Sequence, residues 1–210
     1  MKPIIFSGSM VKAILEGRKT QTRRVIRNSE SDSTIYWNPI VVAGYGGWVN
    51  EHARPRPCPY SPGDFLWVRE TWAQVPASAF RHSIDVQQTA NPSDPTMVAV
   101  YREGWEHSKP SNWKPSIFMP RWASRITLKV EDVRVQRLQD ISEAEAIAEG
   151  VSEPAMFSTD VPGRAGPLMS APNYRAGFGC LWDSINGKKH PWSANDWVWA
   201  LIFSVQEQIN

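Results

Sequence analysis

Residues 61–72, SPGDFLWVRETW, follow a long polar stretch and change abruptly to an apolar, strand-like pattern. A Pro-Gly-Asp sequence predicts a turn at 62–64. Beyond it Phe65 and Trp67 alternate with Leu66 and Val68, so both faces of an extended segment are apolar. That pattern is typical of a strand buried on both sides. The segment therefore predicts a central strand, and the rest of the fold is expected to assemble around it.

Further strands are expected before and after this segment. Apolar runs predict them at PIIF (3–6), MVAVYR (97–102) and WVWALIFSV (197–205), the last as a closing buried strand. Residues 119–138, MPRWASRITLKVEDVRVQRL, predict one long strand or two consecutive strands, because apolar residues alternate from Ile126 onward. Two short strands, TIYW and PIVVA, are expected within 28–61.

Helices are expected at three places. Ser7 or Ser9 can cap the first, whose apolar positions Met10, Ala13 and Ile14 have helical spacing before Gly17. FGCLWDSING (178–187) predicts another short helix that ends at Gly187.

The strongest helix pattern is DISEAEAIAEGV, residues 140–151. Asp140 or Ser142 begins it, and Glu143 and Glu145 occupy the first turn, where acidic residues are favoured. Gly150 is expected to end it. The predicted inward positions are Ala144, Ile147 and Ala148.

Many strands, short helices and no alternation of strand and helix predict an α+β fold with a small, mostly antiparallel β-barrel core. At 210 residues one core is the default, so a single domain over 1–210 is expected. Stretches rich in polar residues, Pro and Gly predict loop insertions at 28–61, 73–95, 103–118 and 152–195.

Composition narrows the function classes. The formal net charge is only +2, so affinity for a polyanion must come from local clusters of basic residues. The two cysteines, Cys58 and Cys180, have no metal-binding spacing, so no metal and no other cofactor are expected. We expect a cytoplasmic protein without a membrane partner, because no window approaches the apolar length of a membrane span. The 11 tryptophans fit either core anchoring or base stacking.

Residues 17–24, GRKTQTRR, form the main basic cluster. It fits a solvated basic strand, a phosphate-binding edge or part of a catalytic site.

The order of GRKTQTRR, GDFLWVRETW (63–72) and LQDISEAEAIAEGV (138–151) resembles the ASCH domain, a member of the PUA-like barrel superfamily. The resemblance covers residues 1–27, 62–72, 97–102, 119–151 and 197–206. It is closest to tryptophan-rich ASCH proteins of phages and prophages. It implies a PUA-like barrel with short flanking helices and a nucleoside or RNA partner. The wider family includes amidohydrolases that deacetylate N4-acetylcytidine, and members proposed to bind or cleave RNA.

The amidohydrolase motif corresponds here to Lys19, Thr22 and Glu149, with Arg24 as the basic residue after the threonine. Thr22 would attack the amide, Lys19 would act as its base, and Glu149 would orient Lys19 or carry a proton. Lys19 and Thr22 have opposite strand parity, so the backbone between them must be irregular. The simpler alternative is a salt bridge between Lys19 and Glu149, with Thr22 in a turn.

Arginines, aromatic residues and one carboxylate supply further nucleoside- or RNA-binding candidates. They are Arg23, Arg24, Arg69, Glu70, Trp72, Arg121, Trp122 and Arg125. In a regular strand Arg121 and Arg125 would share one face, with Trp122 on the other. Glu70 is the reserve catalytic carboxylate, and Trp72 or Trp122 is expected to line the site. All four histidines fall in predicted loops, which disfavours a histidine mechanism.

We therefore expect a hydrolase acting on an acylated nucleobase or nucleoside. The alternatives are an RNA-binding or modified-base-reading module, an RNase, and a phage assembly factor whose Trp-rich loops bind partners.

Overall fold

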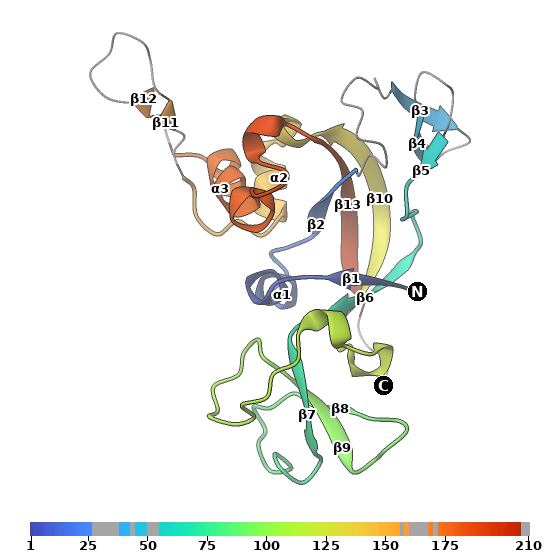
Figure 1. The fold of residues 1–210 in the computed structure, drawn as a ribbon, viewed down its shortest axis with the longest axis vertical. Helices are drawn as coiled ribbons and strands as arrows, with labels where there is room; N and C mark the ends of the chain where they lie inside the picture. The colour runs from blue at the N-terminus through green and yellow to red at the C-terminus, as the bar shows by residue number, and fades with distance from the viewer. Residues whose placement is uncertain are drawn as a thin grey trace. The chain divides into compact units, whose positions relative to one another are not determined.

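The computed structural model describes residues 1–26, 58–155 and 172–206, together with the backbone of five short strands at 38–42, 45–49, 55–57, 158–159 and 168–169. Sheets dominate and helices are few, which confirms the α+β class (Figure 1). The largest sheet contains five strands, which in spatial order are β1 (Lys2–Ile5), β6 (Phe65–Arg69), β10 (Thr127–Arg137), β13 (Trp197–Gln206) and β2 (Gln21–Val25). No closed barrel is established among the described strands, so the PUA-like barrel stays a proposal.

The chain groups into two compact units. Unit 1 comprises Met1–Gly17, Gly63–Val130 and Phe203–Asn210, and unit 2 comprises Arg18–Pro62 and Glu131–Ile202. The single-domain expectation stays a prediction.

Unit 1 contains the predicted central strand. Its elements are β1 (Lys2–Ile5), α1 (Gly8–Leu15), β6 (Phe65–Arg69), β7 (Trp72–Pro76), β8 (Thr89–Ala90), β9 (Met97–Tyr101), the 3-10 turns η1 (Ser116–Phe118) and η2 (Arg121–Ala123), and the first part of β10 (Thr127–Arg137). β6 pairs in parallel with β1 and antiparallel with β10, so it lies between two strands as predicted. Leu66 and Val68 are fully buried on one face, whereas Phe65 on the other is 42% exposed.

The sequence predicts one of the three strands in the second sheet of unit 1 and places most of the other two in a loop. β9 matches the expected strand at 97–102, and it pairs with both β7 and β8. β7 begins at Trp72 and continues to Pro76, into the predicted insertion 73–95. Its WAQVP sequence has a glutamine and a proline in five positions, which hides the strand from a periodicity argument.

The expected strand over 119–126 is wrong. Pro120 precedes the 3-10 turn Arg121–Ala123, and β10 starts only at Thr127. Proline supplies no N–H for a sheet and its fixed φ favours a turn here. The face assignment of Arg121, Trp122 and Arg125 therefore does not apply.

Unit 2 holds the basic cluster and the strongest helix. Its elements are β2 (Gln21–Val25), β3 (Asn38–Val42), β4 (Tyr45–Val49), β5 (Pro55–Pro57), the rest of β10, η3 (Leu138–Asp140), α2 (Glu143–Ala148), β11 (Ser158–Thr159), β12 (Leu168–Met169), α3 (Tyr174–Asn186), η4 (Trp192–Ala194) and most of β13 (Trp197–Gln206). β2 pairs antiparallel with β13, and β3, β4 and β5 form a small sheet. The predicted strand PIVVA corresponds to β3, whereas TIYW lies outside the described residues.

α2 begins with the predicted cap. Glu145 N donates to Ser142 Oγ at 3.2 Å, and the Glu145 carboxylate accepts from Ser142 N at 3.0 Å, a reciprocal capping box. The inward face was misassigned, because Ala146 is buried while Ala144 and Ile147 are exposed. The buried position three residues after Ala146 is Glu149, so one stripe of this short helix carries both a methyl group and a carboxylate inward.

α3 is longer than predicted but ends where expected, before Gly187. Phe178 and Trp182 pack with Leu138, Ile141 and Val198 in the core of unit 2.

The described residues include no helix long and apolar enough to cross a membrane. Cys58 and Cys180 form no disulfide. No cluster of potential metal ligands occurs in the described part of the chain.

Candidate functional site

The segment between α1 and β2 has the irregular backbone that the sequence requires. Gly17 has φ 72°, residues 18–20 have no regular structure, and β2 starts at Gln21. Thr20 N donates to Ala148 O at 2.9 Å, so this segment runs along the end of α2.

Lys19 and Glu149 come together at that point, as predicted. Lys19 Nζ donates to the Glu149 carbonyl at 2.7 Å and to its Oε2 at 2.8 Å, and Arg23 Nη1 donates to Oε1 at 3.0 Å. Lys19 is 0% exposed and Glu149 2%. Glu149 is the C-terminal cap of α2, where the helix dipole disfavours a carboxylate. Two cations compensate for this placement.

Arg23 extends the cluster to Glu145. Its Nη2 lies 3.2 Å from Glu145 Oε2. Neither Nη2 nor Nε makes a hydrogen bond in the described chain, so the contact with Glu145 is an ion pair without a hydrogen bond. We call Lys19, Arg23, Glu145 and Glu149 the Lys19–Glu149 cluster. It contains two cations and two carboxylates, so its formal charges balance.

Burial lowers the pKa of the Lys19 ammonium from its ordinary value. Glu149 opposes that shift, while Arg24 and Arg23 add to it. A lowered pKa favours the amine form of lysine, the form that can accept a proton.

Thr22 lies on the other face of β2 from Arg23. In the β2–β13 register Thr22 pairs with Leu201 and Arg24 with Trp199. Alternation places Thr22 and Arg24 on the other face of the strand from Arg23, yet Arg24 lines the same pocket as Arg23 and lies near enough to Lys19 to lower its pKa. Thr22 is buried as well. Its use as a nucleophile activated by Lys19 stays a prediction.

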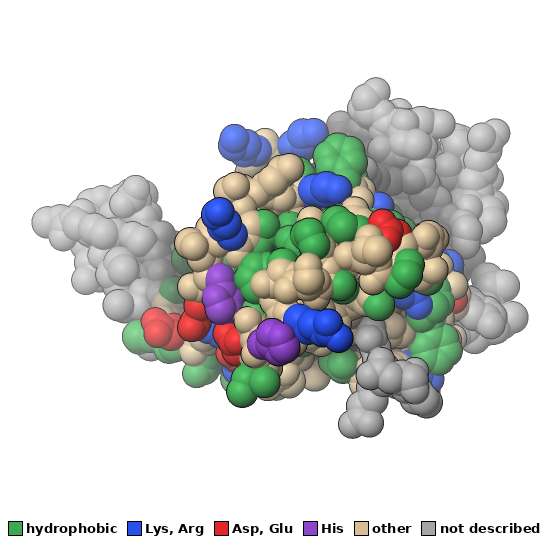
Figure 2. All heavy atoms as spheres, turned by 90° about the horizontal axis from the view of Figure 1, so that it is seen from below, with side chains coloured by type: hydrophobic (Ala, Val, Ile, Leu, Met, Phe, Trp, Pro, Cys, Tyr) green, Lys and Arg blue, Asp and Glu red, His purple; other side chains and the backbone are tan. Residues whose placement is uncertain are grey.

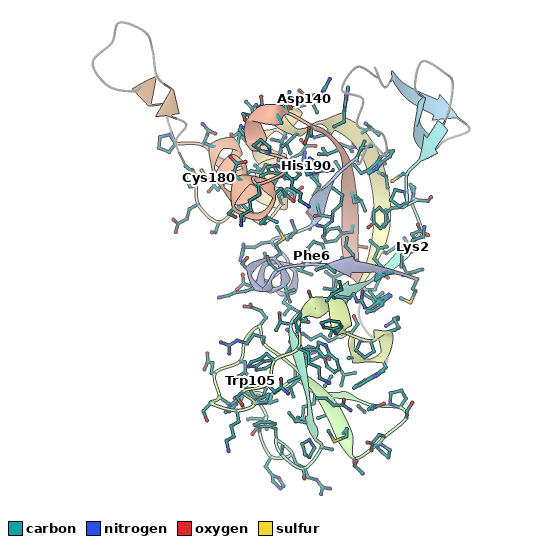
Figure 3. All side chains as sticks on the ribbon, in the orientation of Figure 1. Lys2, Phe6, Trp105, Asp140, Cys180 and His190 are labelled. Carbon is teal, nitrogen blue, oxygen red and sulfur yellow. The ribbon has the colours of Figure 1, made fainter. Side chains whose placement is uncertain are left out.

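Arg24 lines a pocket of about 410 Å³ within unit 2, which we call the Arg24 pocket. The lining residues are Arg23, Arg24, Val25, Ile26, Pro59, Tyr60, Trp182, Asn186, His190 and Trp199. Three are large aromatics, and His190 lies beside α3 (Figure 3). Burial lowers the pKa of the Arg24 guanidinium, while Tyr60 and Glu149 raise it. None of the lining residues is a carboxylate, so an anionic ligand meets no like charge in the wall.

Four of these residues are not among the site residues predicted from the sequence: Tyr60, Trp182, His190 and Trp199. They come from three separate stretches of the chain, and no local pattern links them. The one usable hint was GKKH (187–190), a helix end followed by two lysines and a histidine.

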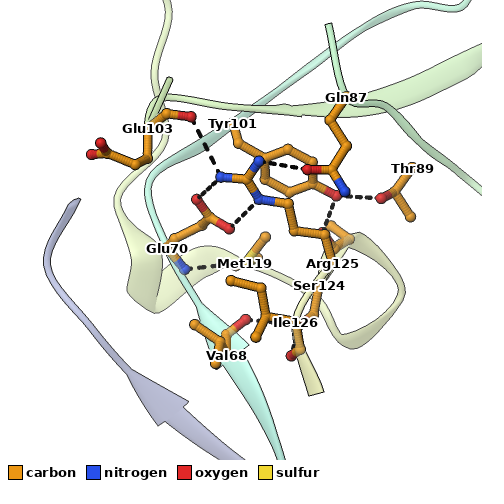
Figure 4. Close-up of polar contacts among 11 residues, drawn as sticks. Val68, Glu70, Gln87, Thr89, Tyr101, Glu103, Met119, Ser124, Arg125 and Ile126 are labelled. Atoms are coloured by element: carbon orange, nitrogen blue, oxygen red, sulfur yellow. Dashed lines mark hydrogen bonds and ion pairs between the residues drawn. The ribbon is translucent and has the colours of Figure 1, made fainter. Parts of the chain in front are cut away.

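Arg125 and Glu70, both candidate ligand contacts, bind each other in unit 1 (Figure 4). Arg125 Nε and Nη2 donate to the two Glu70 carboxylate oxygens at 2.9 and 2.8 Å, and Nη1 donates to Gln87 Oε1 at 2.7 Å. The guanidinium also lies 4.2 Å from the Tyr101 ring centroid. Burial raises the pKa of Glu70 although Arg125 opposes it. Contacts within unit 1 therefore explain the positions of Arg125 and Glu70 without a ligand.

The remaining candidates of unit 1 also pack internally. Arg69 donates twice to Met119 O at 3.1 Å, and both Arg69 and Arg121 lie over the Trp67 ring. Trp72 and Trp122 meet edge to face at 5.9 Å. Neither of these tryptophans lines the Arg24 pocket, which differs from the predicted platform.

Figure 2 shows one face of the molecule on which Lys and Arg side chains are dispersed among hydrophobic and uncharged groups. Among the described residues, that face presents no basic patch for a polyanion.

Comparison with models of protein families, with curated proteins and with solved structures gave no match. The functional argument therefore depends on the geometry and on the motifs themselves.

Proposed function

We propose that the chain binds a nucleotide-type ligand, a segment of single-stranded RNA or a modified base within it, in the Arg24 pocket. The observation that carries this proposal is the cross-strand pair of Arg24 and Trp199, which together line one pocket with Tyr60 and Trp182. An arginine beside aromatic rings suits a phosphate and a stacked base. A volume of about 410 Å³ lies in the range of small-ligand sites.

The geometry of the Lys19–Glu149 cluster fits a binding function in which Lys19 does not contact the ligand. Lys19 is wholly buried, and its amine holds the end of α2 through the Glu149 carbonyl and carboxylate. In this account the Lys19–Glu149 cluster fixes β2, and β2 in turn presents Arg24. The resemblance to ASCH and PUA-like domains supports the same ligand class.

The test is fluorescence anisotropy with a labelled eight-nucleotide RNA at several salt concentrations. Arg24→Ala is expected to weaken binding about tenfold and to make it less salt-dependent, because one phosphate contact is lost. Arg121→Ala is the matched control, since Arg121 lies over Trp67 in unit 1. If Arg24→Ala binds like the wild type while Arg121→Ala does not, the pocket is not the RNA site.

A second candidate is hydrolysis of an N-acylated cytosine. It is favoured by the lowered pKa of buried Lys19 and by Thr22, which lies two residues from Arg24 on the same strand face, about 7 Å along the strand. Thr22 Oγ would attack the acyl carbon and lose its proton to Lys19. The acyl–nitrogen bond would then break as the amine takes up that proton, and water would release the acyl group from Thr22.

Incubation with N4-acetylcytidine tests this second candidate by mass spectrometry of the nucleoside. Cytidine formed by the wild type, and not by Thr22→Val, would support it. Absence of cytidine from neutral to alkaline pH would reject it and leave binding as the function.

A further inference from the structure

We propose that His190, oriented by Asp196, makes the Arg24 pocket a site of RNA strand cleavage. This inference rests on the proposed RNA binding and adds a reaction to it. The substrate is a phosphodiester with a free 2′-hydroxyl, and the sequence alone had set all four histidines aside.

His190 is held at both its backbone and its ring. Its N–H donates to Asn186 O at 2.9 Å, and its carbonyl accepts from Trp182 Nε1 at 2.7 Å. Its Nδ1 lies 2.8 Å from Asp196 Oδ2. A carboxylate at Nδ1 favours the tautomer with hydrogen there, which leaves Nε2 as a base. Since His190 lines the Arg24 pocket, this arrangement is that of an oriented general base beside a ligand cavity.

Asp196 is itself fixed by an unusual backbone. The preceding residue, Asn195, has φ 49°, the only positive φ of a non-glycine residue in the described chain. Gln139 N donates to Asn195 Oδ1 at 2.8 Å and stabilises that conformation. Leu138 N donates to the Asp196 carbonyl at 2.9 Å. Strained residues that the surroundings hold in place are frequent at functional sites.

The charge around His190 favours a phosphodiester over a cationic ligand. Arg24 lines the pocket, and the exposed Lys188 and Lys189 immediately precede His190. The chain offers an instructive contrast in unit 1, where His107 Nε2 lies 3.0 Å from Asp85. The pocket that His107 lines has three carboxylates in its wall against two cations, so its charge is less favourable for a phosphate; these residues are Glu16, Asp85, Glu103, Lys12 and Arg125.

The reaction is an internal transesterification. His190 Nε2 takes the proton of the 2′-hydroxyl, O2′ bonds to phosphorus, and the bond from phosphorus to O5′ breaks. O5′ leaves with a proton from water, and His190 returns its proton to water. The products are a 2′,3′-cyclic phosphate and a 5′-hydroxyl. Arg24 is placed to stabilise charge on the non-bridging phosphate oxygens.

The experiment follows cleavage of a labelled DNA oligonucleotide that contains one ribonucleotide, with an all-DNA oligonucleotide as the substrate control. The wild type is expected to cut only the first, at the ribonucleotide, and mass spectrometry should find the cyclic phosphate. His190→Asn should lower the cleavage rate at saturating RNA about 100-fold or more, which separates lost chemistry from any change in the RNA dissociation constant. His107→Asn, which removes the other aspartate-paired histidine, should cleave like the wild type.

Asp196→Asn tests the positioning role, because it should lower kcat and leave KM nearly unchanged. His190→Gln, purified identically, and thermal melting of all variants separate a folding defect from lost chemistry. Cleavage by His190→Asn and His190→Gln at the wild-type rate would overturn the proposal, and so would a wild type that binds RNA without cutting it. Failure of the wild type to bind would instead overturn the proposed function.

Discussion

The Lys19–Glu149 cluster predicts an asymmetric response to removing its charges. In Glu149→Gln, Lys19 and Arg23 both lose their carboxylate at a site where Lys19 is 0% exposed. Breaking a buried pair from one side costs about 3–5 kcal/mol, because an uncompensated charge stays behind. In Lys19→Met the carboxylate keeps Arg23 at 3.0 Å, so Glu149 is not left without a cation.

Lys19→Met should lower the free energy of unfolding by about 1–2 kcal/mol, less than Glu149→Gln does, for two reasons. Glu149 keeps Arg23, so the loss is one of hydrogen bonds to a charged group, each about 1.5–3 kcal/mol, and leaves no uncompensated charge. Most of that gain is offset in the wild type by the cost of burying the ammonium, the same desolvation that lowers the pKa of Lys19. The double variant Lys19→Met with Glu149→Gln leaves Arg23 beside Glu145. The double variant should therefore be no less stable than Glu149→Gln alone. Its loss of stability is then about 1–2 kcal/mol smaller than the sum of the two single losses, and this difference is the coupling energy of Lys19 and Glu149.

The assay is urea-dependent hydrogen exchange measured on peptides from β2 and β13, so that the free energy of opening is read within unit 2. Lys12→Met is the matched control, because Lys12 is exposed and only 3.9 Å from Glu16. Additive effects of Lys19→Met and Glu149→Gln would refute the reasoning, and so would a Lys19→Met loss as large as that of Glu149→Gln.

Three further predictions concern stability and pH. Arg125→Leu should destabilise unit 1 by about 3 kcal/mol in urea denaturation, because the buried Glu70 carboxylate loses its bidentate partner, and Glu70→Leu in the same chain should recover part of the loss. Because burial raises the pKa of Glu70, its protonated form favours folding, and that contribution is lost as pH rises from the ordinary value of 4.5 through the folded value. Urea titrations across that range should show unit 1 weakening with pH in the wild type and not in Glu70→Gln. Ser142→Ala should lower the free energy of opening of α2 by about 1 kcal/mol, because the capping box is lost. Hydrogen exchange measures this free energy, and an unchanged value would contradict the prediction.

Local sequence chemistry predicted the elements that frame the cluster. Ser142 and Glu145 are three residues apart, the spacing of a capping box, and α2 starts there. The Lys19–Glu149 contact came from the motif resemblance and from the argument that a carboxylate at a helix end needs a cation.

Long-range packing decided what the sequence could not predict. The sequence around Trp122 predicts a strand, but Pro120 favours the turn that the structure has at Arg121–Ala123. Arg125 was expected to contact a phosphate, yet a buried carboxylate, Glu70, takes its guanidinium. The Arg24 pocket joins side chains from four separate stretches of chain, so the periodicity within any one stretch does not predict it.

The most direct test is a crystal structure with a short RNA whose 2′-hydroxyls are methylated, so that it binds without being cut. The account predicts a base among Tyr60, Trp182 and Trp199, with a phosphate oxygen within hydrogen-bond distance of Arg24 and the methylated 2′-oxygen facing His190 Nε2. RNA bound instead over Trp67, on Arg69 and Arg121, with the Arg24 pocket empty, would contradict it.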